Sequence, residues 1–286
     1  MKPNFNQEAN MFNYQLADGQ SVPALGFGTY KLNGISGVRA IQSAIDAGYR
    51  MIDTAYNYEN EGAVGEAIRR SSVARDELTV VSKLPGRYYH YQDAIDHLQE
   101  SLFRSGLDHF DLYLLHWPNP KRDQYVEAWQ ALIAAQKFGL VQSIGVCNFL
   151  PEHLDRLYAE TGVMPVVNQI ELHPYFNQAK QIEADAERHV LTAAWSPLGR
   201  ASAVLQEPAL QAIAQAHGKT ISQVILRWDL QLGVMTIPKS AHLSRQKENL
   251  NVFDFELTDQ EMAAIAQLTK PDGRTKGQDP ATYEEF

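Results

Sequence analysis

The sequence predicts an α/β protein built as a (β/α)8 TIM barrel, with an N-terminal β-hairpin and extra C-terminal helices. Three observations predict this fold. From about residue 50 onward, short β-prone apolar segments alternate regularly with amphipathic helical segments. Apolar runs such as Val80-Val81 and Val166-Val167 are typical of parallel strands that are covered on both faces. The length of 286 residues suits one barrel, so we expect a single domain over residues 1–286.

Composition excludes several classes of function. The net charge is -9 and the chain has no basic run, which argues against binding to a nucleic acid backbone. Cys147 is the one cysteine, so neither an internal disulfide nor a cysteine-rich metal site can form. The polar residues 1–10 lack a signal-peptide core, and no apolar run approaches the ~18 residues of a membrane span. We therefore expect a cytoplasmic monomer without membrane or nucleic acid partners.

The elements follow from local patterns. Alternating apolar residues around Asp18-Gly19 predict a hairpin over 12–22. A short strand is expected over 25–30, and a helix over 37–47 that ends at Gly48. The remaining predicted elements are strands 50–55, 78–83, 110–117, 143–148, 166–171, 190–196 and 234–239, helices 61–70, 92–105, 125–138, 151–160, 178–188, 207–217, 220–231, 244–251 and 258–268, and a polar tail over 271–286.

Polar residues gather where the predicted strands end. Asp53, Lys83 and His116 close three consecutive strands, and Tyr58 lies in the loop after the first of them. Active sites of such barrels lie at the carboxyl ends of the strands. Neighbouring strands are ~4.8 Å apart, so these side chains should lie within contact range. The strand-end residues are Gly28, Asp53, Lys83, His116, Cys147, Gln169, Trp195 and Lys239.

Taken singly, each of these residues has an ordinary structural explanation. An Asp at a strand end often begins a turn, a Lys there is usually solvated, and His116 between apolar neighbours could be a core histidine. Together they make a proton-transfer site. A buried Lys83 ammonium favours the Tyr58 phenolate and lowers its pKa, while Asp53 neutralises Lys83. His116 can donate a hydrogen bond to a carbonyl oxygen that gains negative charge. The histidines show no paired metal-ligand spacing, so we expect no metal.

Several motifs in this order resemble those of the aldo-keto reductase family, over a region from Pro23 to about Asn249. At position 195 the chain has Trp where a tyrosine is commoner in the family. In this respect it resembles the prokaryotic branch that includes the 2,5-diketogluconate reductases. Cys147 replaces a commoner serine, and we interpret it as a small core residue. The motifs that carry the resemblance are Asp53-Thr54-Ala55-x-x-Tyr58-x-Asn60-Glu61, Ser82-Lys83-Leu84-Pro85, Leu115-His116-Trp117-Pro118, Gly145-Val146-Cys147-Asn148-Phe149, Asn168-Gln169-Ile170-Glu171-Leu172-His173-Pro174 and Ile237-Pro238-Lys239-Ser240.

The resemblance implies NADPH-dependent reduction of aldehydes and ketones to alcohols, for small polar carbonyls such as diketo sugars or keto-aldehydes. The cofactor would be held without a GxGxxG fingerprint, which the chain lacks. Tyr58 would be the general acid, with Asp53, Lys83 and His116. Lys239, Ser240 and Arg245 would bind the 2′-phosphate, which needs clustered cations. The implied cofactor residues are Gly28, Thr29, Asp53, Cys147, Asn148, Gln169, Trp195, Ser196, Pro197, Leu198, Gly199, Lys239, Ser240, Arg245, Glu248 and Asn249.

The substrate would lie at a mouth lined by Tyr30, Asn57, His116 and Trp117. The rim loops and the tail over 271–286 are short, which predicts an open pocket.

Two other functions stay open. A Schiff-base barrel lyase with Lys83 as nucleophile would share the fold. A non-catalytic nucleotide-binding sensor or subunit would keep the cofactor residues without turnover.

Overall fold

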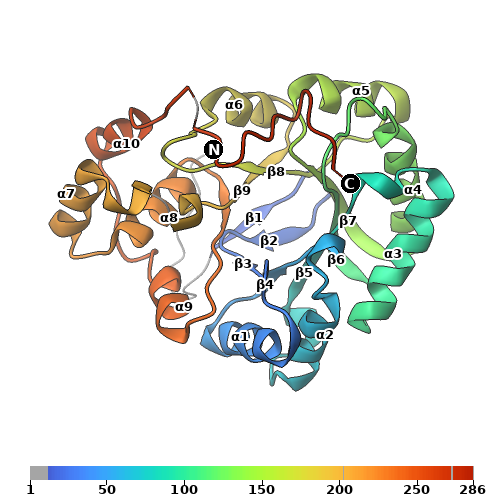
Figure 1. Cartoon of the computed structure of the whole chain (residues 1–286), viewed down its shortest axis with the longest axis horizontal. Coiled ribbons are helices and arrows are strands. Elements are labelled where there is room, and N and C mark those ends of the chain that lie inside the picture. The colour runs from blue at the N-terminus through green and yellow to red at the C-terminus, as the bar shows by residue number, and fades with distance from the viewer. Residues whose placement is uncertain (1–11, 202, 272, 286) are drawn as a thin grey trace.

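The computed structural model describes residues 12–201, 203–271 and 273–285. Eight strands form one sheet in the order β10-β9-β8-β7-β6-β5-β4-β3, and neighbours in this order are parallel. This confirms the predicted barrel, which Figure 1 shows with its ring of helices. The strands are β3 (Phe27–Gly28), β4 (Met51–Asp53), β5 (Thr79–Leu84), β6 (Phe110–Leu115), β7 (Val141–Cys147), β8 (Val167–Glu171), β9 (Leu191–Trp195) and β10 (Met235–Ile237).

Backbone pairing between the first and last strands closes the barrel. Leu25 forms a parallel bridge with Thr236. The Gly28 amide donates to the Pro238 carbonyl at 3.0 Å. At Gly26, an added Cβ would lie 3.0 Å from the Met51 sulfur, so a larger residue would crowd the interior. Gly26 therefore serves close packing inside the barrel.

The helices cover the outside of the sheet. Their first and last residues lie within a few residues of the predicted bounds. Their apolar faces pack on β-branched and aromatic side chains in one large core cluster, with a smaller cluster around α7 and α8. The α-helices are α1 (Gly34–Ala47), α2 (Glu61–Arg70), α3 (Tyr91–Ser105), α4 (Tyr125–Lys137), α5 (Pro151–Thr161), α6 (Ala179–Glu187), α7 (Pro208–His217), α8 (Ile221–Gln231), α9 (Leu243–Leu250) and α10 (Asp259–Ala266). Short 3-10 helices are η1 (Tyr56–Tyr58), η2 (Arg75–Glu77), η3 (Gly86–Tyr88), η4 (Gly199–Ala201) and η5 (Ala203–Gln206).

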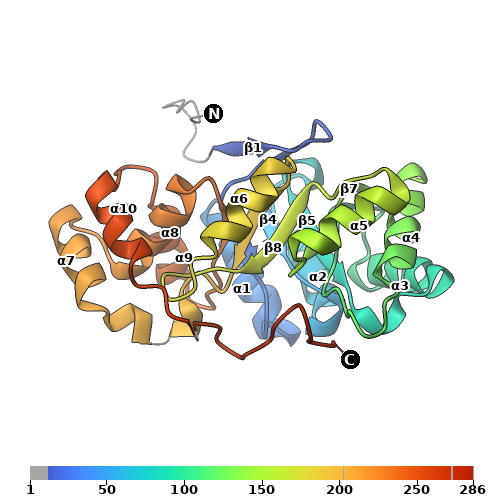
Figure 2. The ribbon, with the colours of Figure 1, turned by 90° about the horizontal axis from the view of Figure 1, so that it is seen from above.

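The two ends of the barrel are covered by different segments. Strands β1 (Asn13–Gln15) and β2 (Ser21–Pro23) form the predicted antiparallel hairpin. Leu16 and Val22 of the hairpin pack with interior residues of the barrel. Figure 2 shows this hairpin on one side of the molecule and the C-terminal tail along the opposite side. The tail therefore lies at the end of the barrel where the predicted site residues are found.

Within the described residues, none of the helices combines the length and the apolar character that a membrane crossing requires. Residues 1–10, for which the sequence predicts no signal peptide, lie outside the described part of the chain.

Candidate active site

A buried ion pair forms the base of the site. The Lys83 Nζ atom, on β5, lies 2.6 Å from Asp53 Oδ1, at the end of β4. Lys83 Nζ also donates to the Thr54 carbonyl at 2.7 Å. The Lys83 side chain is fully buried and that of Asp53 is 5% exposed. Burial by itself disfavours the ammonium, but Asp53 raises the pKa of Lys83 above its ordinary value. Lys83 is therefore a cation at neutral pH.

The loop after β4 places Tyr58 over this pair. The Lys83 Nζ atom lies 5.2 Å from the centre of the Tyr58 ring. Asn60 fixes the loop by accepting from Thr54 Oγ1 at 2.6 Å and donating to the Thr29 carbonyl at 2.7 Å. Just before it, Glu59 adopts a left-handed conformation with φ 54°, which ends η1 and turns the chain back. The phenol thus meets the strand-end groups, as the sequence predicts.

The pKa of Tyr58 differs from the expectation. Burial raises it to about 12, while Lys83 has the opposite and smaller effect. The predicted influence of Lys83 is present, but loss of solvation outweighs it. The Tyr58 hydroxyl is therefore protonated at neutral pH and can donate a proton.

His116 completes the predicted group of four. It follows β6, and its ring centre lies 6.1 Å from that of Tyr58. Its side chain is 14% exposed. All four predicted catalytic side chains thus lie at one end of the barrel. We find no group of three or more His, Cys, Asp or Glu residues suited to a metal ion in the described ranges.

The predicted nicotinamide residues form a connected group beside Asp53. Gln169 Nε2 donates to Asp53 Oδ2 at 2.9 Å. Trp195 Nε1 donates to Asn148 Oδ1 at 2.8 Å, and Asn148 Nδ2 donates to the His116 carbonyl at 3.0 Å. The amide nitrogen of Gln169 and both polar atoms of the Asn148 side chain therefore have protein partners. Cys147 is buried, and burial raises the pKa of its thiol well above the usual value, which agrees with a core role.

The predicted phosphate-binding residues lie at the start of α9 and at the end of β10. Lys239 and Arg245 are exposed, so both cations are accessible. The Ser240 hydroxyl donates to the His242 carbonyl, and Glu248 accepts from Thr220 Oγ1 at 2.8 Å. In the predicted pyrophosphate loop of residues 196–199, Ser196 and Gly199 have φ angles of 52° and 53°. Pro197 and Gly199 are buried, Leu198 is half-buried and Asn249 is buried against Tyr49.

Gly28 and Thr29, at the end of the first strand, contact the neighbouring strand ends. The Thr29 hydroxyl donates to the Asp53 carbonyl at 2.9 Å, so its role within the protein is to hold the end of β4. A Cβ at Gly28 would lie 3.5 Å from Lys239 Cβ, which places Gly28 against the end of β10.

The C-terminal tail changes the predicted open mouth. The rings of Tyr283 and Trp117 have centres 4.5 Å apart. Glu285 is buried, with its Oε1 atom 2.7 Å from His116 Nδ1 and accepting from Asn57 Nδ2 at 2.7 Å. Tyr30 remains 41% exposed, with its ring centre 5.0 Å from that of Tyr58. The mouth is thus bordered by the tail, and sequence reasoning missed Tyr283 and Glu285 because no local pattern marks them.

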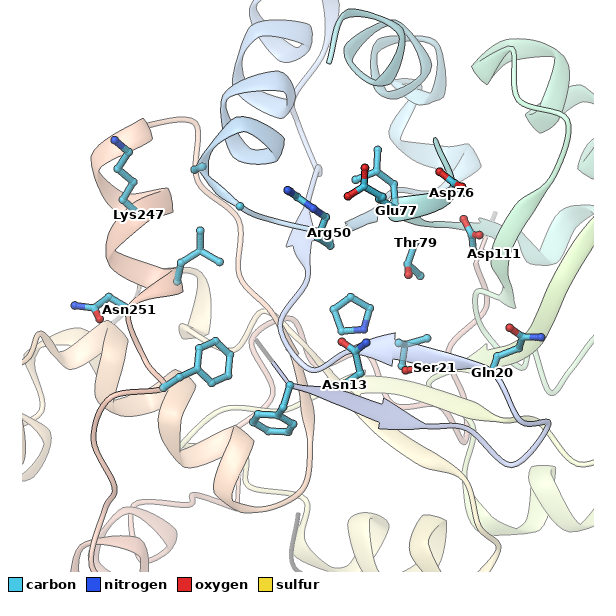
Figure 3. Close-up of a pocket in the computed structure, with 18 of the residues that line it drawn as sticks. Asn13, Gln20, Ser21, Arg50, Asp76, Glu77, Thr79, Asp111, Lys247 and Asn251 are labelled. Carbon is cyan, nitrogen blue, oxygen red and sulfur yellow. The ribbon is translucent and has the colours of Figure 1, made fainter. Parts of the chain in front are cut away.

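A cavity of about 1240 Å³ lies at the other end of the barrel and is lined in part by the hairpin (Figure 3). Its lining includes Arg50, Thr79 and Asp111, which stand at the amino ends of strands. None of the four predicted catalytic residues lines it. Since chemistry in such barrels occurs at the carboxyl ends of the strands, this cavity is separate from the candidate active site.

Comparison with known proteins agrees with these observations. The aldo/keto reductase family model matches residues 24–270. The chain is 50% identical over 277 residues to a 2,5-diketo-D-gluconic acid reductase B from Corynebacterium, covering 97% of this chain and 99% of that protein. It is 45% identical to a methylglyoxal reductase DkgA from Salmonella typhimurium, covering 96% and 99%.

Solved structures show the same likeness. An aldo/keto reductase from Brucella melitensis matches with a TM-score of 0.87 at 41% identity, covering 90% of this chain and 99% of that one. A variant of Gox0644 in complex with NADPH matches with a TM-score of 0.91 at 39% identity, covering 96% and 99%. These matches confirm the predicted fold and family. The chain belongs to the aldo/keto reductase family.

Proposed function

We propose that this protein uses NADPH to reduce small polar aldehydes and ketones to alcohols, with Tyr58 as the proton donor. The observation that carries the proposal is the buried Lys83–Asp53 pair beneath the Tyr58 ring, at the carboxyl ends of the strands. The substrate class rests on relatives named for 2,5-diketo-D-gluconic acid and methylglyoxal, which are small polar carbonyl compounds.

The four residues would divide the proton chemistry between them. NADPH, when bound, supplies a hydride to the carbonyl carbon. Tyr58 gives its proton to the carbonyl oxygen, and its pKa of about 12 keeps that proton in place until charge develops on the substrate. Lys83 stabilises the phenolate that remains, while Asp53 keeps Lys83 charged and oriented. His116 orients the carbonyl oxygen by hydrogen bonding.

The residues of the cofactor site fit a phosphorylated dinucleotide. Lys239 and Arg245 are exposed cations beside the first turn of α9, where free backbone amides favour an anion. Trp195 is held by Asn148 and is half-buried, so one ring face can lie against a nicotinamide. Residues 196–199 would border the pyrophosphate. These features favour NADPH over NADH.

The structure gives a reason to prefer this function to a Schiff-base lyase. A lysine nucleophile must lose its proton, whereas Asp53 and the Thr54 carbonyl hold Lys83 as an ammonium. A nucleotide-binding sensor would not need Tyr58 and His116 beside that ammonium. We include in the proposal that the protein is a monomer and is cytoplasmic. The free, buried Cys147 suits the reducing conditions of the cytoplasm.

The test is NADPH consumption with a panel of aldehydes, diketones and keto-sugars. Tyr58→Phe should bind NADPH with unchanged affinity but lose about 100-fold or more in kcat, the usual contribution of a general acid. Tyr158→Phe is the matched control, because it removes a phenol hydroxyl from an exposed position on α5. Parent-like turnover by Tyr58→Phe would refute the assignment of the acid.

Two further outcomes separate the rival functions. Borohydride trapping of substrate on Lys83 would favour the lyase. NADPH binding without turnover across the whole panel would favour the sensor.

A further inference from the structure

The C-terminal tail reaches the centre of the candidate active site through one carboxylate. Figure 2 shows the tail running along the side of the barrel opposite the hairpin, to the C-terminus. There the side chain of Glu285 turns inward and is 8% exposed. Its Oε1 atom lies 2.7 Å from His116 Nδ1 and accepts from Asn57 Nδ2 at 2.7 Å. Its Oε2 atom accepts from the Gly86 amide at 3.2 Å.

Hydrogen bonds to its main chain also hold Glu285 in place. The Glu285 amide donates to Asn119 Oδ1 at 3.1 Å, and Asn119 Nδ2 donates to the Glu285 carbonyl at 2.9 Å. An added Cβ at Gly86 would lie 2.2 Å from Asn119 Nδ2. The close approach of the tail thus depends on a glycine at 86. These paired bonds and the tight fit describe a built binding position for Glu285.

The charge of Glu285 suits its neighbours. Burial opposes its ionisation, but His116 and the donors from Gly86 and Asn57 hold the pKa of Glu285 below its usual value. A buried carboxylate is costly unless it is paired and hydrogen-bonded. The hydrogen-bond partners of the Glu285 carboxylate are the donors of Asn57 and Gly86, and its charged partner is the His116 ring. Glu285 is therefore an anion placed against one nitrogen of His116.

A carboxylate beside one ring nitrogen of a histidine fixes the rotation of the ring, as carboxylates do for histidines in metal sites and catalytic triads. When both ring nitrogens carry protons, one is held by the carboxylate and the other can donate to a carbonyl oxygen. Asn57, which donates to the same Glu285 carboxylate, directly precedes Tyr58 in η1. Glu285 thus joins the element that carries the acid to the residue that orients the carbonyl.

We propose that Glu285 is a positioning residue that fixes the His116 ring, and through Asn57 the Tyr58 loop, for carbonyl reduction. The inference rests on the proposed function and extends it, since it makes docking of the tail a requirement for turnover rather than a passive boundary of the pocket. Glu285 itself acts through His116 and Asn57.

The test compares Glu285→Gln with Glu284→Gln in the full chain. Both changes remove one negative charge from neighbouring tail positions. Glu284, however, accepts from the Lys121 amide and has no contact with His116 among those the structure records. In Glu285→Gln the amide nitrogen is a donor facing other donors, so it cannot serve His116, Asn57 and Gly86 together.

Two measurements separate positioning from general damage. In Glu285→Gln, kcat for the best carbonyl substrate should fall about ten- to a hundredfold, with a much smaller change in NADPH affinity. The ¹⁵N chemical shifts of the His116 ring, which report which nitrogen carries a proton, should change in Glu285→Gln and match the parent in Glu284→Gln.

Three results would overturn the inference. These are parent-like kcat in Glu285→Gln, an equal loss of kcat in Glu284→Gln, or a loss in Glu285→Gln while the His116 ring shifts stay those of the parent. If the parent reduces no carbonyl compound, the proposed function fails, yet the ring shifts still test the contact between Glu285 and His116.

Discussion

Removing Lys83 tests whether the ion pair at the base of the site is a unit. In Lys83→Met the ammonium disappears from a fully buried position, while Asp53 stays behind with a carboxylate that is 5% exposed. Gln169 still donates to Asp53 Oδ2, but Oδ1 loses its partner at 2.6 Å. The variant therefore leaves a buried charge that is only partly compensated.

The magnitude follows from the contact distance. Two unit charges 2.6 Å apart attract by about 6 kcal/mol at an effective dielectric constant near 20. Desolvation of both groups offsets much of this, so the pair adds little net stability by itself. Breaking it from one side is different, and should cost about 3–5 kcal/mol of the free energy of unfolding.

The assay is a double-mutant cycle of Lys83→Met and Asp53→Asn, with unfolding in urea followed by circular dichroism. Each single variant should be less stable than the parent. The double variant should be more stable than the sum of the two losses predicts, because neither charge is then left alone. If the losses simply add, or if Lys83→Met costs less than about 1 kcal/mol, the interpretation of a coupled buried pair is wrong.

Lys83→Met should also affect catalysis. Without Lys83, the main influence that opposes the effect of burial on the Tyr58 hydroxyl is lost, so its phenolate becomes harder to form. Lys83→Met should lower kcat by about 100-fold or more while NADPH still binds. Unchanged turnover would show that Lys83 has a structural role alone.

Further predictions concern the cofactor site, a buried acid and the loop under the tail. Arg245→Ala should weaken NADPH binding about ten- to a hundredfold in a fluorescence titration and leave NADH binding nearly unchanged; equal losses would exclude the 2′-phosphate assignment. Asp185 accepts from Asn168, Gln181 and Thr192, so Asp185→Asn should cost about 1–3 kcal/mol of unfolding free energy. Because burial raises the pKa of Asp185 to about 6, its protonation favours the folded state as pH falls from 6 toward 4, and the variant should lose this contribution in unfolding curves across that range. Gly86→Ala should displace Asn119 and the tail, lowering kcat/KM roughly ten- to a hundredfold. Gly139→Ala, which meets no atom within 4 Å but strains a backbone with φ 77°, should lower stability and leave kcat/KM unchanged.

Much of the fold follows from local rules. Hydrophobic periodicity predicted each strand and helix of the barrel within a few residues, and Asp18-Gly19 predicted the hairpin turn. The convergence of Asp53, Lys83 and His116 was predictable too, because parallel strands in one barrel end at the same mouth. The residues themselves thus determined which chemical groups meet.

What only the tertiary structure decided are quantities and contacts that depend on distant parts of the chain. Lys83 lowers the pKa of Tyr58, as the sequence predicted. Burial raises that pKa by more, and the extent of burial is a property of packing. Glu285 accepts from Asn57 although the two are 228 positions apart, and no periodicity connects such residues.

The sequence by itself therefore determined the barrel, the family and the residues at the strand ends, because these depend on repeating local patterns. The folded chain decided the charge balance at Tyr58, the position of the tail on His116 and the border of the mouth. Desolvation and long-range contacts set these features, and both arise only when the whole barrel has closed.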